Sequence, residues 1–90
     1  MKEFRWDEDK NKKLKEERGI SFEEILGSKF LGAERHNTRK NQMVLLFEHN
    51  KYVWVVPSVV EDEYIFLKTM FPSRKYTNKF RPKEARNEKD

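Results

Sequence analysis

The chain has 90 residues, of which 36% are hydrophobic, 13% aromatic and 40% charged, with a net charge of +4. So few apolar side chains fill one core and exclude a second. The sequence has no cysteine, which excludes disulfide frameworks, zinc–thiolate clusters and thiol nucleophiles and fits a reducing cytosol. No run approaches the roughly 18–20 apolar residues of a membrane span, and the first residues form no apolar secretion signal. We therefore expect a cytoplasmic protein that does not contact membranes.

The positive charge is concentrated near the C-terminus. Residues 68–90 hold eight basic and three acidic side chains, a surplus of five. Such a surplus predicts that this end meets a polyanion or an acidic partner. For residues 81–90 alone, a solvated tail kept soluble by its charges is the better interpretation. We expect a single domain over residues 1–80 and a charged, disordered tail over residues 81–90.

The first predicted elements are a strand and a polar helix. In residues 4–6 two aromatic side chains alternate with a charged one, as in a short edge strand. Asp7 can cap a helix over Glu8–Arg18, and Gly19 supplies the usual stop. Leu14 is the only apolar residue inside that helix. We therefore expect the helix to make at most one apolar contact and to be more exposed than a core helix.

A second helix has a stronger start signal. Ser21 and Glu24 form a capping box, in which the serine hydroxyl accepts from the amide of residue 24 and the glutamate reaches back. The side chains that follow form one apolar face at helical spacing, which predicts that this face belongs to the core. That face consists of Phe22, Ile25, Leu26 and Phe30.

The remainder of the chain has the period-two pattern of strands. Ala33–His36 is a candidate short strand, and Met43–Phe47 with Tyr52–Val56 reads as a hairpin. After a turn at residues 61–63, Tyr64–Phe71 is another strand, and Ser73 can cap a short C-terminal helix. The predicted fold class is α+β, an antiparallel meander with the two N-terminal helices packed on one face.

Several segments resemble the BrnT family of bacterial toxins. The residues at positions 4, 6, 7 and 10 are similar to that family's F-x-W-D-x-x-K, and residues 19–24 are similar to the end of its H-G-V-S-F-E-E. The pair Arg35-His36 stands where the family carries a basic pair after its second helix. The strand Tyr64–Phe71, leading into Ser73, Arg74 and Lys75, resembles the family's closing strand and its S-A-R-K segment.

The resemblance spans about residues 4–80 and is greatest to a little-characterised branch of the family. The sequence departs from the family at three points. Arg18 replaces the histidine of H-G, and Tyr76 stands where the family has alanine. Thr77–Phe80 replaces a run of two arginines and a closing tyrosine.

The resemblance implies a RelE-like toxin fold and a toxin of a type II toxin–antitoxin system. Its implied activity is metal-independent endoribonuclease cleavage of mRNA, which inhibits translation. Its implied partner is a ribbon-helix-helix antitoxin (BrnA/CopG-like), through which alone the system would contact operator DNA.

RNA cleavage needs few protein groups, because the 2′-OH of RNA is the nucleophile. The protein must remove a proton, stabilise charge at phosphorus and protonate the leaving oxygen, which requires no metal and no cofactor. His36 has an unperturbed pKa near 6.5, and Arg74 offers a guanidinium fork for phosphate. The predicted catalytic residues are Arg35, His36, Arg74 and Lys75. The predicted RNA-binding residues are Arg39, Tyr76 and Lys79, where Tyr76 would stack a base or donate a proton.

Other interpretations remain open. His36 is equally well read as an exposed loop histidine, and Arg74 and Lys75 as a basic helix end that complements the helix dipole. Two other functions also fit. One is a non-catalytic BrnT-like protein that binds its antitoxin and acts in operator DNA binding and autoregulation. The other is a protein-interaction module with no role in nucleic-acid chemistry.

Overall fold

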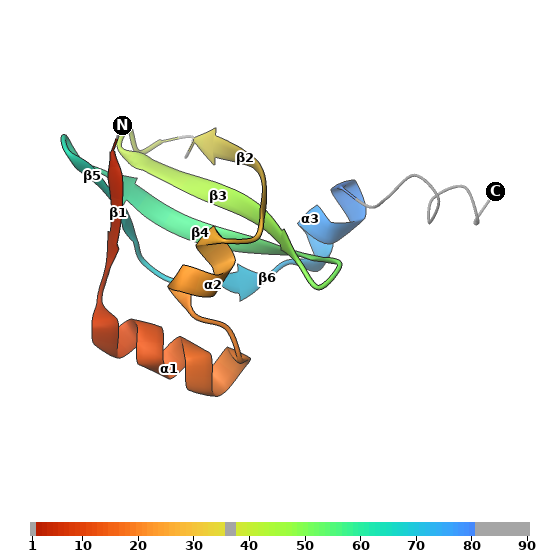
Figure 1. Ribbon diagram of the computed structural model, residues 1–90. Coiled ribbons are helices and arrows are strands. Elements are labelled where there is room, and N and C mark those ends of the chain that lie inside the picture. The colour runs from red at the N-terminus through yellow and green to blue at the C-terminus, as the bar shows by residue number, and fades with distance from the viewer. Residues whose placement is uncertain (1, 36–37, 81–90) are drawn as a thin grey trace.

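A computed structural model describes residues 2–35 and 38–80, which form a six-stranded sheet with three helices (Figure 1). Five strands follow the order β1-β5-β4-β3-β2, and β6 pairs with β4. Within the described residues, no helix is long and apolar enough to cross a membrane. In chain order, the elements are β1 (Glu3–Trp6), α1 (Glu8–Arg18), α2 (Phe22–Leu26), β2 (Lys29–Arg35), β3 (Gln42–His49), β4 (Tyr52–Val60), β5 (Tyr64–Leu67), β6 (Phe71–Pro72) and α3 (Arg74–Lys79).

The predicted α+β class is confirmed, but the sheet is mixed and not wholly antiparallel. Strands β2 to β5 form the expected antiparallel meander. β1 pairs with β5 in parallel, with Phe4 opposite Ile65 and Trp6 opposite Leu67. No hairpin links β1 to a sequence neighbour, so local turn geometry does not set its direction. The long connection to β5 permits the parallel arrangement.

α1 has the predicted bounds and is mostly exposed, as predicted. The Asp7 side chain accepts from the amides of Asp9 and Lys10, and Gly19 ends the helix in the left-handed conformation, with φ of 78°. Leu14 is only 2% exposed and belongs to the main core. A polar neighbour on the same face is also buried, because it is hydrogen-bonded to α2.

That neighbour is Asn11, which is 6% exposed. Its side-chain amide donates to Glu23 Oε1 at 2.7 Å, and its Oδ1 accepts from the Phe22 amide at 2.7 Å. A buried side-chain amide costs little when both its donor and acceptor are used. Asn11 therefore joins α1 to the start of α2 and allows both helices to pack on one face of the sheet.

α2 begins at the predicted capping box but ends at Leu26, whereas the apolar spacing predicted a helix that reaches Phe30. Ser21 Oγ accepts from the Glu24 amide at 3.2 Å, and Glu24 Oε1 accepts from the Ser21 amide at 2.8 Å. Phe22 and Ile25 are fully buried. Phe30, predicted to belong to the same helical core face, instead lies in β2 and is 56% exposed. The helix ends at Leu26 and Gly27 follows as its cap, so the spacing that linked Phe30 to the helix was coincidental.

The closing strand also differs from its prediction. The expected single strand over Tyr64–Phe71 is two strands, because β5 ends at Leu67 and β6 pairs instead with Trp54 and Val55 of β4. Between them the fully buried Met70 turns into the core. β4 in turn runs past the predicted end at Val56 to residue 60.

The two faces of the sheet carry separate apolar clusters. Strand pairing places Leu45, Phe47 and Val56 on the face that α1 and α2 cover. The alternate residues Leu46, Val53 and Val55 lie on the other face, where Tyr76 of α3 packs against them. α3 therefore lies on the opposite side of the sheet from α1 and α2.

Candidate functional site

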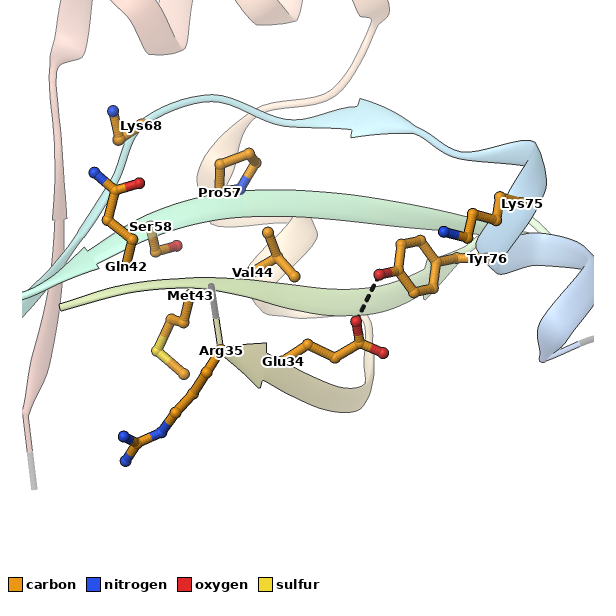
Figure 2. A pocket seen from close by; sticks show the side chains of 10 residues that line it. All are labelled: Glu34, Arg35, Gln42, Met43, Val44, Pro57, Ser58, Lys68, Lys75 and Tyr76. Carbon is orange, nitrogen blue, oxygen red and sulfur yellow. Dashed lines mark hydrogen bonds between the residues drawn. The ribbon is translucent and has the colours of Figure 1, made fainter. Parts of the chain in front are cut away.

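A pocket of about 410 Å³ lies on the α3 side of the sheet (Figure 2). Its floor is formed by Val44 of β3 and Pro57 of β4, which are register partners. Glu34, also opposite Val44, and Tyr76 line one end, while Lys68 and Gln42 line the other. The pocket thus lies across three strands and against the first turn of α3.

Local hydrogen bonds hold α3 over this pocket. Ser73 Oγ accepts from the Tyr76 amide at 3.2 Å, as the predicted cap requires. The Ser73 amide donates to the carbonyl of Val53 at 2.9 Å, and the Val53 amide donates to Thr77 Oγ1 at 2.8 Å. Both polar groups of the Val53 backbone are therefore bonded to α3. These bonds fix a helix of only six residues against β4.

Tyr76 connects α3 to β2 across the pocket. Its hydroxyl donates to Glu34 Oε1 at 2.6 Å, and Lys79 Nζ lies 3.5 Å from Glu34 Oε2. The hydrogen bond from Tyr76 lowers the pKa of the Glu34 carboxyl, and the charge of Lys79 lowers it further. The same hydrogen bond raises the pKa of Tyr76, with burial adding to the effect. Glu34 therefore stays ionised and Tyr76 stays protonated near neutral pH.

Two lysines flank the Tyr76 ring. Lys75 Nζ lies 5.7 Å and Lys79 Nζ 5.8 Å from its centroid, within cation–π range. In Figure 2 the Lys75 ammonium lies beside the ring at the pocket's rim. An aromatic surface beside ammonium groups is suited to an anionic ligand that also carries a flat ring.

The predicted site residues are gathered only in part. Lys75 and Tyr76 line the pocket, and Arg35 does so from the end of β2. Arg35 is opposite Met43, however, and Figure 2 shows its guanidinium pointing away from Tyr76. Lys79 reaches Glu34 but is not among the pocket's lining residues.

The remaining predicted residues are elsewhere. Arg74 is the exposed first residue of α3, and Arg39 is exposed between β2 and β3; neither lines this pocket. His36 lies outside the described residues, as does the predicted tail over residues 81–90. Within residues 2–35 and 38–80, no group of three or more His, Asp or Glu side chains is placed to hold a metal ion.

Glu34, Lys68 and Gln42 were missed by sequence reasoning. Glu34 was within a predicted strand, but its orientation depends on the register with β3, which no local pattern specifies. Lys68 lies in a segment predicted to continue a strand. Only the pairing of β2, β3 and β4 brings these three residues to one pocket.

No family model and no curated protein sequence matches the chain. Among solved structures, it is similar to the 1.1 Å crystal structure of the ribonuclease toxin BrnT of Brucella abortus, with 18% identity. The superposition covers 81% of this chain and 97% of that one, with a TM-score of 0.52. The chain has the BrnT fold. The predicted resemblance to BrnT is confirmed at the level of the fold.

Proposed function

We propose that this chain is the toxin component of a type II toxin–antitoxin system, a metal-independent endoribonuclease that cleaves mRNA and inhibits translation. The observation that carries this proposal is the fold shared with a ribonuclease toxin over 97% of that toxin's length. The pocket beside α3 provides the place for the reaction. It combines ammonium groups with a positioned aromatic ring, which are the groups that single-stranded RNA requires.

In the proposed reaction, the 2′-oxygen of RNA attacks the adjacent phosphorus and the bond from phosphorus to the 5′-oxygen breaks. The products are a 2′,3′-cyclic phosphate and a 5′-hydroxyl, whose oxygen takes its proton from solvent water. Lys75 would stabilise the charge that develops on the phosphoryl oxygens. Arg74, exposed beside it at the start of α3 but outside the pocket lining, is a candidate for the same role. His36, next in the sequence after Arg35, would take the 2′-OH proton, because its ordinary pKa suits that transfer near neutral pH. Arg35 would assist by its positive charge, because a guanidinium stays protonated and can stabilise the phosphoryl oxygens but cannot take the 2′-OH proton.

The role of Tyr76 is narrowed by its hydrogen bond. Its proton is directed at Glu34, and its pKa is raised, so proton donation to a leaving oxygen is disfavoured. Its ring lies between two ammonium groups. We therefore assign Tyr76 to stacking of a base and Glu34 to holding the ring in position.

The test is cleavage of a single-stranded RNA in EDTA, with the 3′ products identified by mass. Lys75→Ala should lower the rate by about 10²–10³-fold, the usual effect of losing one transition-state contact. Tyr76→Phe should retain more activity than Tyr76→Ala, because only the ring is required for stacking. Lys13→Ala, which removes an exposed lysine from α1, is the matched control and should cleave normally.

Loss of cleavage in Lys13→Ala, or an unchanged rate in Lys75→Ala, would contradict this assignment. So would a product with a linear phosphate formed without the cyclic intermediate.

A second candidate is the non-catalytic protein that binds an antitoxin. The contacts and the lowered pKa of Glu34, a carboxylate that lines the pocket, favour this function. Glu34 is already bonded to Tyr76 and paired with Lys79, and its lowered pKa makes it a poor base. Complete absence of cleavage at high protein concentration, with tight antitoxin binding, would support this function.

Both candidates imply a ribbon-helix-helix antitoxin (BrnA/CopG-like) with an acidic segment over Arg74, Lys75 and Lys79. All three side chains are exposed. Salt screens exposed charge pairs, so affinity for the antitoxin should fall as salt is raised from about 50 mM to about 500 mM. Titration calorimetry at several salt concentrations measures this, and a constant affinity would exclude an electrostatic interface at α3.

A further inference from the structure

The helix-covered face of the sheet is only half covered. In Figure 1, α1 and α2 lie over one end of the sheet, and no helix lies over the end where β1 begins. Two adjoining hollows occupy that open end, with volumes of about 400 and about 450 Å³. They share Met43 and Ile65 as lining residues. We call these two hollows together the open trough.

Most of the lining of the open trough is apolar, and two of its phenylalanine side chains are exposed to solvent. Phe30 is 56% exposed and Phe4 is 41% exposed. Phe30 packs against Phe47 with ring centroids 5.4 Å apart, so it is held in place at the trough's wall. Clustered apolar surface of this kind on a small domain marks an interaction site.

The trough's dimensions suit one helix. Its lining comes from five of the six strands, from Phe4 on β1 through Ile65, Val60 and Met43 to Ala33 on β2. Five adjacent strands span about 19 Å at the usual spacing. A helix of about 13 residues has that length. It would complete the layer that α1 and α2 begin.

An added strand is the less suitable occupant. The edge strands beside the trough are β1, which has only four residues, and β2, whose pairing with β3 shifts between Phe30 and Gly32. Gly32 has φ of 149°, so the edge bends there. Bulges of this kind interrupt the hydrogen-bonding row that another strand would need.

The charged side chains that line the trough indicate which charge the bound helix carries. Among the described residues that line it, the charged side chains are Arg35 and Lys40, both at one end. Residues 81–90 of this chain carry no large apolar side chain, so they do not supply the occupant. We infer that the open trough binds an amphipathic helix of a partner protein, with its acidic residues beside Arg35 and Lys40. This inference uses neither α3 nor its lysines, although Arg35, Gln42 and Met43 line both the trough and the pocket beside α3, so the two hollows meet near the end of β2.

The test uses the full chain and a fluorescein-labelled helical peptide of about 14 residues, long enough to cross the sheet. One face of the peptide carries leucines, and two glutamates occupy its first turn. A companion peptide has lysines in place of those glutamates. Fluorescence anisotropy should give a dissociation constant about 5-fold lower for the acidic peptide, the size expected of exposed charge pairs.

Two substitutions of exposed phenylalanines locate the site. Phe30→Glu should weaken binding of the acidic peptide at least about 10-fold, because it places a charge in the trough. Phe71→Glu is the matched control, since Phe71 is 39% exposed but lies on the α3 side. It should leave the affinity within about 2-fold. Both variants should keep the circular dichroism of the parent, and Phe30→Glu, which loses its contact with Phe47, should melt only slightly lower.

A charge reversal tests the orientation. Lys40→Glu should remove or invert the preference between the two peptides while leaving leucine-dependent binding intact. Equal weakening by Phe30→Glu and Phe71→Glu would overturn the inference. So would a dimer, detected by sedimentation, that Phe30→Glu dissociates, because the occupant would then be a second copy of the chain. An unchanged preference in Lys40→Glu would overturn the assigned position of the acidic residues.

Discussion

α1 and α3 are held to the sheet in opposite ways. α1 buries Leu14 and Asn11. The Asn11 side chain joins it to α2, because it donates one hydrogen bond to Glu23 and accepts one from the Phe22 amide. α3 has no buried residue and depends on Ser73, Thr77 and Tyr76 for its position. The two sets of helices therefore have different roles in this small domain. The α1–α2 pair contributes to the main core, whereas α3 presents exposed cations and is held by a few polar bonds and by the half-buried Tyr76 ring.

The largest expected effect tests the α1 side of this comparison. Leu14→Ala should lower the free energy of unfolding by about 3 kcal/mol, because it empties a site in the core that lies between the helices and the sheet. Urea denaturation measures the change. Lys13→Ala on the neighbouring, exposed position should change the stability by less than about 0.5 kcal/mol. A Leu14→Ala cost as small as that of the control would mean that α1 packs only loosely.

The two serine caps compare the helices directly. Ser21→Ala removes the α2 capping box and should lower the global stability by about 1 kcal/mol. Ser73→Ala removes the same kind of bond from α3, but α3 lacks buried side chains, so the loss should appear as local opening. Amide hydrogen exchange at Tyr76 and Thr77 should accelerate while the urea midpoint changes by less than half of the Ser21→Ala effect.

A Ser73→Ala variant with a full loss of global stability and no local change in exchange would break the comparison. It would mean that α3 unfolds together with the core.

The features that could be predicted from sequence are those decided within a few residues. Asp7, Gly19, Ser21 and Ser73 each begin or end a helix as expected, because a cap depends on neighbouring amides and carbonyls. The hairpin between β3 and β4 is also local, and its turn places Asn50 at φ of 54°. These helix ends and this hairpin are enough to determine the fold class.

The features that sequence reasoning missed depend on distant contacts. Asn11 is buried because its side chain bonds to α2, and Phe30 is exposed because α2 ends before reaching it. β1 pairs in parallel with a strand about sixty positions away. At the candidate site, Lys75 and Tyr76 were expected, but their partner Glu34 is set by strand register and by the length of α3's connection to β6.

The smallest expected effect is a change in stability at low pH, and it arises from a contact between α1 and α2. Lys15 Nζ donates to both carboxylate oxygens of Glu24, at 2.8 and 3.0 Å, and this contact lowers the pKa of Glu24 to about 2, with the Ser21 amide contributing. The folded protein therefore holds Glu24 ionised more strongly than the unfolded chain, whose carboxyl has the ordinary value of 4.5. The resulting stabilisation is fully present above pH 4.5 and is lost as the pH falls from there toward 2. Because this pair is exposed to solvent, the effect is small and screened by salt. The melting temperature of Glu24→Gln should consequently fall less steeply than that of the parent between pH 4.5 and pH 2. Glu16→Gln, an exposed position on α1, should keep the parent's slope. Equal slopes for the parent and Glu24→Gln would show that the capping box holds its carboxylate no more tightly in the folded chain than in the unfolded one.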